Sequence, residues 1–146
     1  MSRVAFKTQQ RDDREIHFSV GALIRRDSHL LLIDRAKPPL GLAGVAGHID
    51  VDEETLAALK REVAEETGMI VEAANLLGEG FIEWNWCNSG VTGHYWYVYD
   101  CQVSGEVEIS QAEVKSFGWH DPTKLTQDQL EPVWYYWLNK LGIINK

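Results

Sequence analysis

The segment 47–69 constrains this chain most, because a helix-forming stretch there carries an unusual row of carboxylates. Apolar side chains recur at helical spacing, and glycine at position 68 is a residue that commonly ends a helix. The pattern predicts a helix over Glu53–Thr67, with Asp50 or Asp52 as its N-cap. The row of carboxylates makes the polar face of this helix a candidate functional site.

This predicted helix has two distinct faces. At about 100° per residue, a core face forms from Leu56, Leu59, Val63 and Thr67. The neighbouring face carries Glu62, Glu65 and Glu66, which are surface neighbours because they lie three or four residues apart. Three clustered carboxylates repel one another, although such a cluster alone would also suit a solvated acidic surface.

A divalent cation would relieve this repulsion. Mg²⁺ binds carboxylate oxygens together with phosphate oxygens, so the face suits a phosphorylated substrate. Arg61 lies beside the carboxylates and is placed to orient one of them. The helix alone therefore leaves two interpretations open, an acidic surface and a metal site.

The spacing of the whole segment favours the metal site. It resembles the Nudix box, which is a Gly, five residues, a Glu, seven residues, and then Arg-Glu-apolar-x-Glu-Glu-x-Gly-apolar. Every fixed position is present: Gly47, Glu53, Arg61, Glu62, Glu65, Glu66 and Gly68, with apolar Val63 and Met69. The family commonly has Pro-Gly-Gly at the start of the box, where this chain has Val-Ala-Gly ending at Gly47. That difference affects the dihedral angles of the loop.

The resemblance implies an α/β (α+β) fold, a Nudix-type α/β/α sandwich with a mixed central sheet. We find no repeat or linker, so we expect a single domain over residues 1–146. A glycine- and proline-containing loop is expected over Arg35–Gly47 and a polar turn over Arg25–Ser28. The predicted strands are Ile16–Ile24, His29–Ile33, Ile70–Leu77, Gly80–Trp84, Tyr95–Val103 and Val114–His120. The further predicted helices are Pro122–Leu130 and Pro132–Leu141.

The resemblance also implies roles for the residues of the box. Glu62, Glu65 and Glu66 would ligate Mg²⁺ or Mn²⁺, and the backbone carbonyl of Ala46 would add a ligand. Glu53 would support the metal shell or position water, and Arg61 would hold a glutamate of the box in place.

The implied activity is metal-dependent hydrolysis of a diphosphate linkage in a nucleoside diphosphate joined to another group, by metal-activated water. Candidate substrates are a nucleoside triphosphate, ADP-ribose, a dinucleoside polyphosphate and a nucleotide sugar. The general base in this family often lies outside the box, so Glu113 is the first candidate and Glu106 and Glu108 are weaker ones.

Substrate selection would come from the loops. Trp84 and Trp86 could stack on a nucleobase, although alternating tryptophans more often form the core-facing side of a strand. His48, beside the box, could contact phosphate. The aromatic run 134–137 is expected to pack in the core, and it could also cover a second copy in a homodimer.

Charge and composition restrict the partners. A net charge of −8 argues against a nucleic acid polymer, but not against a small phosphorylated ligand reached through metal ions. The chain shows no signal-peptide core and no membrane-length apolar run, so we expect a cytoplasmic protein without a membrane partner. Cys87 and Cys101 are expected to be reduced thiols, although their pairing is not excluded.

The sequence disfavours three alternative interpretations. A Nudix-fold module that senses a nucleotide without cleaving it has no chemical need for all three glutamates of the box, and this chain keeps them. An isomerase of allylic diphosphates would need additional Cys and Glu residues that we could not place. A calcium loop starting at Asp50 is rejected, because its sixth position is Thr55 and its twelfth is Arg61. The sequence therefore predicts hydrolysis.

Overall fold

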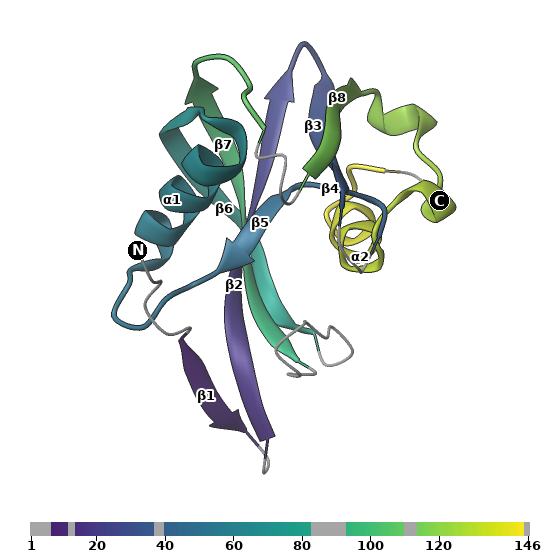
Figure 1. Ribbon diagram of the computed structural model, residues 1–146. Helices are drawn as coiled ribbons and strands as arrows, with labels where there is room; N and C mark the ends of the chain where they lie inside the picture. The colour runs from purple at the N-terminus through teal and green to yellow at the C-terminus, as the bar shows by residue number, and fades with distance from the viewer. Residues whose placement is uncertain (1–6, 12–13, 37–39, 83–92, 110–113, 145–146) are drawn as a thin grey trace.

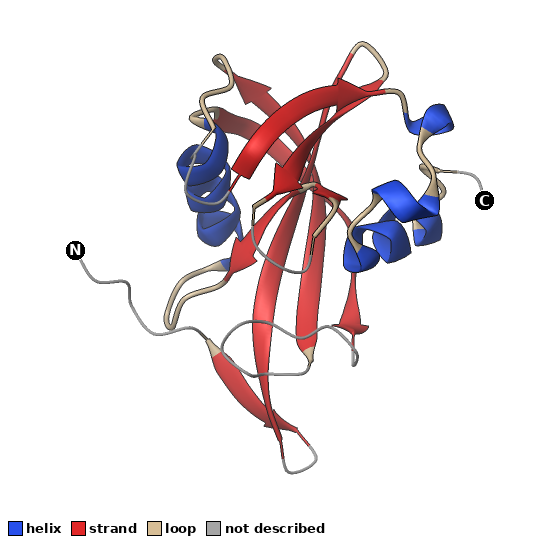
Figure 2. Ribbon diagram, turned by 45° about the vertical axis from the view of Figure 1, so that its right-hand side comes forward, coloured by secondary structure: helices blue, strands red, loops and turns tan. Residues whose placement is uncertain are grey.

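The computed structural model describes residues 7–11, 14–36, 40–82, 93–109 and 114–144. One mixed sheet dominates the fold, and a helix lies on each side of it (Figure 1; Figure 2). The strands are β1 (Thr8–Arg11), β2 (Arg14–Arg26), β3 (His29–Arg35), β4 (Leu42–Ala43), β5 (Val45–His48), β6 (Ile70–Ile82), β7 (His94–Ser104) and β8 (Val114–His120). The two α-helices are α1 (Thr55–Thr67) and α2 (Pro132–Lys140).

The long strand β2 organises the sheet. It pairs in parallel with β7 and antiparallel with β1, β3 and β5, and β7 continues to β6. A tight turn at Asp27 and Ser28 joins β2 to β3, and both residues have positive φ (53° and 68°), as a two-residue hairpin turn requires. Because β5 pairs with β2, the start of the box is built into the sheet.

Two apolar clusters form the core, one on each face of the sheet. The helix α1 packs on one face through Ala58, Leu59 and Val63. The helix α2 packs on the other through Trp134, Trp137 and Leu138. The predicted α/β/α sandwich with a mixed sheet is therefore confirmed. Among the described residues, no helix has the length and hydrophobicity that crossing a bilayer requires.

The predicted strands are largely confirmed, with two differences. The segments expected at 70–77 and 80–84 form one strand, β6, whose register with β7 shifts at two places; residues 83 and 84 lie outside the described part. The segment 35–47, expected to be a loop, contains β4 and all of β5 except its last residue, His48. These strands are too short to show an alternating pattern, so sequence periodicity did not reveal them.

The predicted start of the box helix was wrong. The helix begins at Thr55 with Glu54 as its N-cap, not Asp50 or Asp52. Leu56, expected in the core, is 46% exposed, and buried Ala58 takes that place. The C-terminal end is as predicted, because Gly68 adopts φ 75° and its N–H donates to the carbonyl of residue 64 at 2.9 Å.

The helix expected over Pro122–Leu130 was also wrong. The segment forms two 3₁₀ turns, Pro122–Lys124 and Gln127–Gln129. The Asp121 carboxylate accepts a hydrogen bond from the N–H of Thr123, and Thr126 and Gln129 form a capping box. Side chains that bind nearby backbone groups in this way start new turns and interrupt a continuous helix.

We expect the acid that caps α2 to make stability depend on pH. Buried Glu131 accepts hydrogen bonds from the N–H groups of Val133 (2.8 Å) and Trp134 (3.1 Å), and burial raises its pKa. The folded state therefore binds this proton more tightly than the unfolded state, so this contribution to stability falls as pH rises from the ordinary glutamate pKa of about 4.3 through the raised value. Glu131→Gln keeps an acceptor oxygen and should abolish that decline.

Urea unfolding of both proteins from about pH 4 to about pH 8 measures this difference. The advantage of Glu131→Gln over the wild type should grow with pH. Glu131→Ala is the control: it removes the cap and should be about 0.5–2 kcal/mol less stable than Glu131→Gln at every pH. Parallel curves for the wild type and Glu131→Gln would contradict the prediction.

Candidate active site

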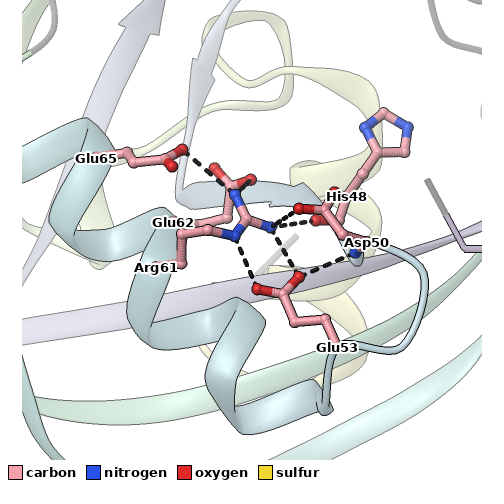
Figure 3. Close-up of polar contacts among 6 residues, drawn as sticks. All are labelled: His48, Asp50, Glu53, Arg61, Glu62 and Glu65. Carbon is pink, nitrogen blue, oxygen red and sulfur yellow. Dashed lines mark hydrogen bonds and ion pairs between the residues drawn. The ribbon is translucent and has the colours of Figure 1, made fainter. Parts of the chain in front are cut away.

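Arg61 is the centre of the polar cluster built by the box (Figure 3). Its Nη1 donates to Glu62 Oε2 at 3.0 Å and to Glu65 Oε1 at 3.3 Å. Its Nη2 donates to the backbone carbonyl of His48 at 2.9 Å and lies 3.6 Å from Asp50 Oδ2. One guanidinium therefore joins the helix α1 to the end of β5 and to the turn that follows.

Glu53 fixes the position of this guanidinium. Its two carboxylate oxygens accept hydrogen bonds from Arg61 Nε at 2.8 Å and Nη2 at 3.0 Å, a two-point contact. The same carboxylate accepts from the N–H of Asp50 at 2.9 Å. Hydrogen bonding to Glu53 raises the pKa of Arg61 above its ordinary value, so this residue stays a cation. Glu53 therefore organises the turn before α1.

Glu62 lies between α1 and β5. Only 5% of Glu62 is exposed, and its carboxylate occupies the space where a side chain on Gly47 would lie. The absence of a Cβ at this position thus makes room for the carboxylate. The position of the Glu62 carboxylate therefore depends on the glycine at position 47.

The cluster carries an excess of negative charge. Four carboxylates, those of Asp50, Glu53, Glu62 and Glu65, contact the single guanidinium of Arg61. The side chain of Glu65 is 53% exposed, so it can reach a ligand in solution. Glu66, one residue further along α1, is buried. Oxygen donors with unbalanced negative charge are the environment that a hard divalent cation prefers, so these residues fit Mg²⁺ or Mn²⁺.

The chain matches a known protein family over most of its length. The family model of the NUDIX domain matches residues 15–141. The chain belongs to the Nudix family of hydrolases. A "MutT-like protein" of Streptomyces ambofaciens is 31% identical over 112 residues, which cover 76% of this chain and 67% of that relative.

Solved structures support the Nudix assignment. A MutT NUDIX hydrolase from Burkholderia pseudomallei has 27% identity and a TM-score of 0.75, covering 85% of this chain and 96% of that one. The MutT protein of Methanosarcina mazei Go1 shares the fold, with 24% identity, a TM-score of 0.73 and coverage of 88% and 94%. Nudix hydrolases are a pyrophosphohydrolase group that generally uses divalent metals and acts on small nucleotide-type substrates.

Several candidate residues of this Nudix hydrolase lie outside the described part of the chain. They are Trp84, Trp86, Cys87 and Glu113. Of the weaker candidates for the base, Glu106 and Glu108 are both exposed. The N–H of Glu108 donates to the carbonyl of Thr67 at 2.6 Å, which places it at the C-terminal end of α1. Within the described residues, Cys101 is a buried free thiol whose pKa burial raises to about 12.

His48 has two separate environments. Its backbone carbonyl accepts from Arg61, whereas its imidazole points away from the guanidinium (Figure 3). The imidazole lies with those of His17 and His94 in a cluster that the sequence analysis missed. These three histidines lie far apart in the chain, so no sequence motif reveals the cluster. Only the register of β2 with β5 and β7 brings them together. Burial lowers the pKa of His17.

Proposed function

We propose that this chain is an active hydrolase that uses Mg²⁺ or Mn²⁺ to cleave a diphosphate linkage in a nucleoside diphosphate joined to another group. The proposed substrates are a nucleoside triphosphate, ADP-ribose, a dinucleoside polyphosphate or a nucleotide sugar. The observation that carries the proposal is the Arg61 cluster, which gathers Glu53, Glu62 and Glu65 beside β5. A complete and organised carboxylate set favours chemistry over simple recognition.

Glu62, Glu65 and Glu66, with the backbone carbonyl of Ala46, would hold the metal. The position of the Ala46 carbonyl supports this assignment. This carbonyl is bonded to the nitrogen of Gly47, and the Glu62 carboxylate packs against Gly47. When bound, the metal would neutralise phosphate oxygens and acidify water that attacks phosphorus. The carboxylates differ in exposure: Glu62 and Glu66 are buried, and Glu65 faces solvent. Glu65 would therefore be the proposed ligand most accessible to a substrate in solution.

Arg61 and Glu53 are proposed as positioning residues. The two-point contact of the guanidinium with Glu53 holds it rigidly, and the guanidinium in turn orients the carboxylates of Glu62 and Glu65. This arrangement lowers the cost of ordering the carboxylates when metal and substrate bind. Glu113 remains the proposed general base, and Trp84, Trp86 and His48 the proposed contacts for substrate.

A hydrolysis panel tests the proposal. The purified chain should be incubated with members of the four substrate classes, each with Mg²⁺, with Mn²⁺ or with excess chelator, and the products separated by chromatography. We expect cleavage of at least one class with either metal and loss of cleavage with chelator. Products from attack on the diphosphate linkage would identify the bond that breaks.

The outcome that would contradict hydrolysis is binding without cleavage, as expected of a nucleotide-sensing module. The chain would then bind one of the same compounds in a calorimetric titration but leave it intact over the whole panel.

A further inference from the structure

Three histidines from three different strands meet on one face of the sheet. His17 on β2 is the direct partner of His94 on β7, and His48 on β5 is opposite Ser19, two residues further along β2. Because side chains two residues apart on a strand share a face, all three imidazoles project to the same side. The register of β2 with its two neighbours therefore creates the cluster.

This face is opposite to the carboxylates of the box. Gly47, against which Glu62 packs, is one residue before His48, and successive residues of a strand point to opposite faces. The strand β5 thus separates two chemically different groups. The carboxylates are oxygen donors on the α1 side, and the imidazoles are nitrogen donors on the α2 side.

The ring nitrogens are spaced as ligands of one ion would be. One ligand nitrogen from each histidine lies within 4.8 Å of the others, and His94 Nε2 is 3.3 Å from His48 Nε2. Zinc binds imidazole nitrogen at about 2.0–2.1 Å, so two nitrogens of a tetrahedral site are about 3.3–3.4 Å apart. The pair His48 and His94 already has this separation, and the ligand nitrogen of His17 lies within 4.8 Å of both.

The surroundings suit a bound ion. His17 and His94 are 4% and 3% exposed, and packing against neighbouring strands limits their motion. The rings of His48 and His94 form a 3.3 Å hydrogen bond, and the ring of His17 lies edge-on to that of His48 with 4.9 Å between the centroids. Imidazole favours zinc and similar transition ions over magnesium, so this cluster and the carboxylates would select different metals.

We propose that His17, His48 and His94 form a site for Zn²⁺ or a similar transition-metal ion, separate from the carboxylates of the box. Three protein nitrogens leave one tetrahedral position for water or another ligand. An ion there would link β2, β5 and β7. Because the backbone carbonyl of His48 binds Arg61, the ion would also restrain the segment that holds the guanidinium.

Zinc binding to the full chain tests this site. After chelator treatment and dialysis, Zn²⁺ should be titrated in excess Mg²⁺, which occupies the carboxylates, and the bound zinc measured by calorimetry and elemental analysis. We expect one equivalent per chain. His48→Gln and His94→Asn should each weaken this binding by more than about tenfold, because each removes one of three ligands. His29→Gln, the matched control at a histidine of β3 that lies outside the cluster, should bind zinc as the wild type does.

Two further measurements test the site, and the first needs no variant. Zn²⁺ should shift the ring ¹⁵N resonances of three histidines in the wild type, whereas Mg²⁺ should not. It should also raise the thermal midpoint of the wild type but not of His48→Gln, because an ion that binds only the folded state stabilises it. Unchanged histidine resonances, or equal zinc affinity in the wild type and both histidine variants, would overturn the proposal.

Discussion

Glu65→Gln and Glu66→Gln are each expected to lower kcat by a factor on the order of 10² or more, with little change in the fold. Glutamine has nearly the shape of glutamate but lacks the negative charge that a divalent cation requires of its ligand. The side chain of Glu65 is 53% exposed, so its replacement costs little packing. Glu66 is buried, and replacing it by the neutral amide removes a buried charge.

Steady-state rates at saturating Mg²⁺, on the substrate found with the panel, measure this effect. Glu54→Gln is the matched control, because it changes the same side chain at an exposed position on the N-cap of α1. It should keep a near-wild-type rate. Circular dichroism and thermal unfolding should show all three variants folded. Wild-type rates in both Glu65→Gln and Glu66→Gln would rule out the proposed metal ligands.

Gly47→Ala is expected to damage both activity and stability. A Cβ at this position would overlap the carboxylate of Glu62, so either the side chain or β5 must move. Overpacking of this kind costs about 1–3 kcal/mol. The displaced carboxylate would lose its 3.0 Å contact with Arg61 and its proposed place as a metal ligand, so we expect kcat to fall on the order of 10²-fold.

The control for this substitution is Gly80→Ala on β6. Among the described residues, nothing lies within 4 Å of a Cβ placed there, so its free energy of unfolding should change by less than about 0.5 kcal/mol. Denaturant unfolding and steady-state kinetics of both variants provide the comparison. If Gly47→Ala were as stable and as active as Gly80→Ala, the close packing of β5 against Glu62 would have no functional importance.

The sequence predicted most of the regular structure and the family, whereas the chemistry of the box stays a prediction. Fixed spacing identified the glutamates, and Gly68 identified the end of α1, because both signals are local. The contact between Arg61 and the carbonyl of His48 joins residues from a helix and a strand, and it depends on how α1 packs on β5. Local patterns contain no information on that packing.

The errors have the same origin. Leu56 has the helical spacing of a core residue, but the position of α1 on the sheet leaves it 46% exposed. His17 and His94 meet only because β2 and β7 pair in parallel with one particular register. Strand register is set by long-range pairing and is not visible in the order of residues along the chain.

The four-residue strand β5 makes this enzyme unusually sensitive to changes in chain length. Its pairing with β2 directs Gly47 toward α1 and His48 toward the opposite face. Deleting or inserting a single residue just before β5 would reverse these directions, bring an imidazole against the Glu62 carboxylate and remove a ring from the histidine cluster. We therefore expect homologues that keep both groups to vary in loop length elsewhere while keeping the number of residues between β4 and α1 constant.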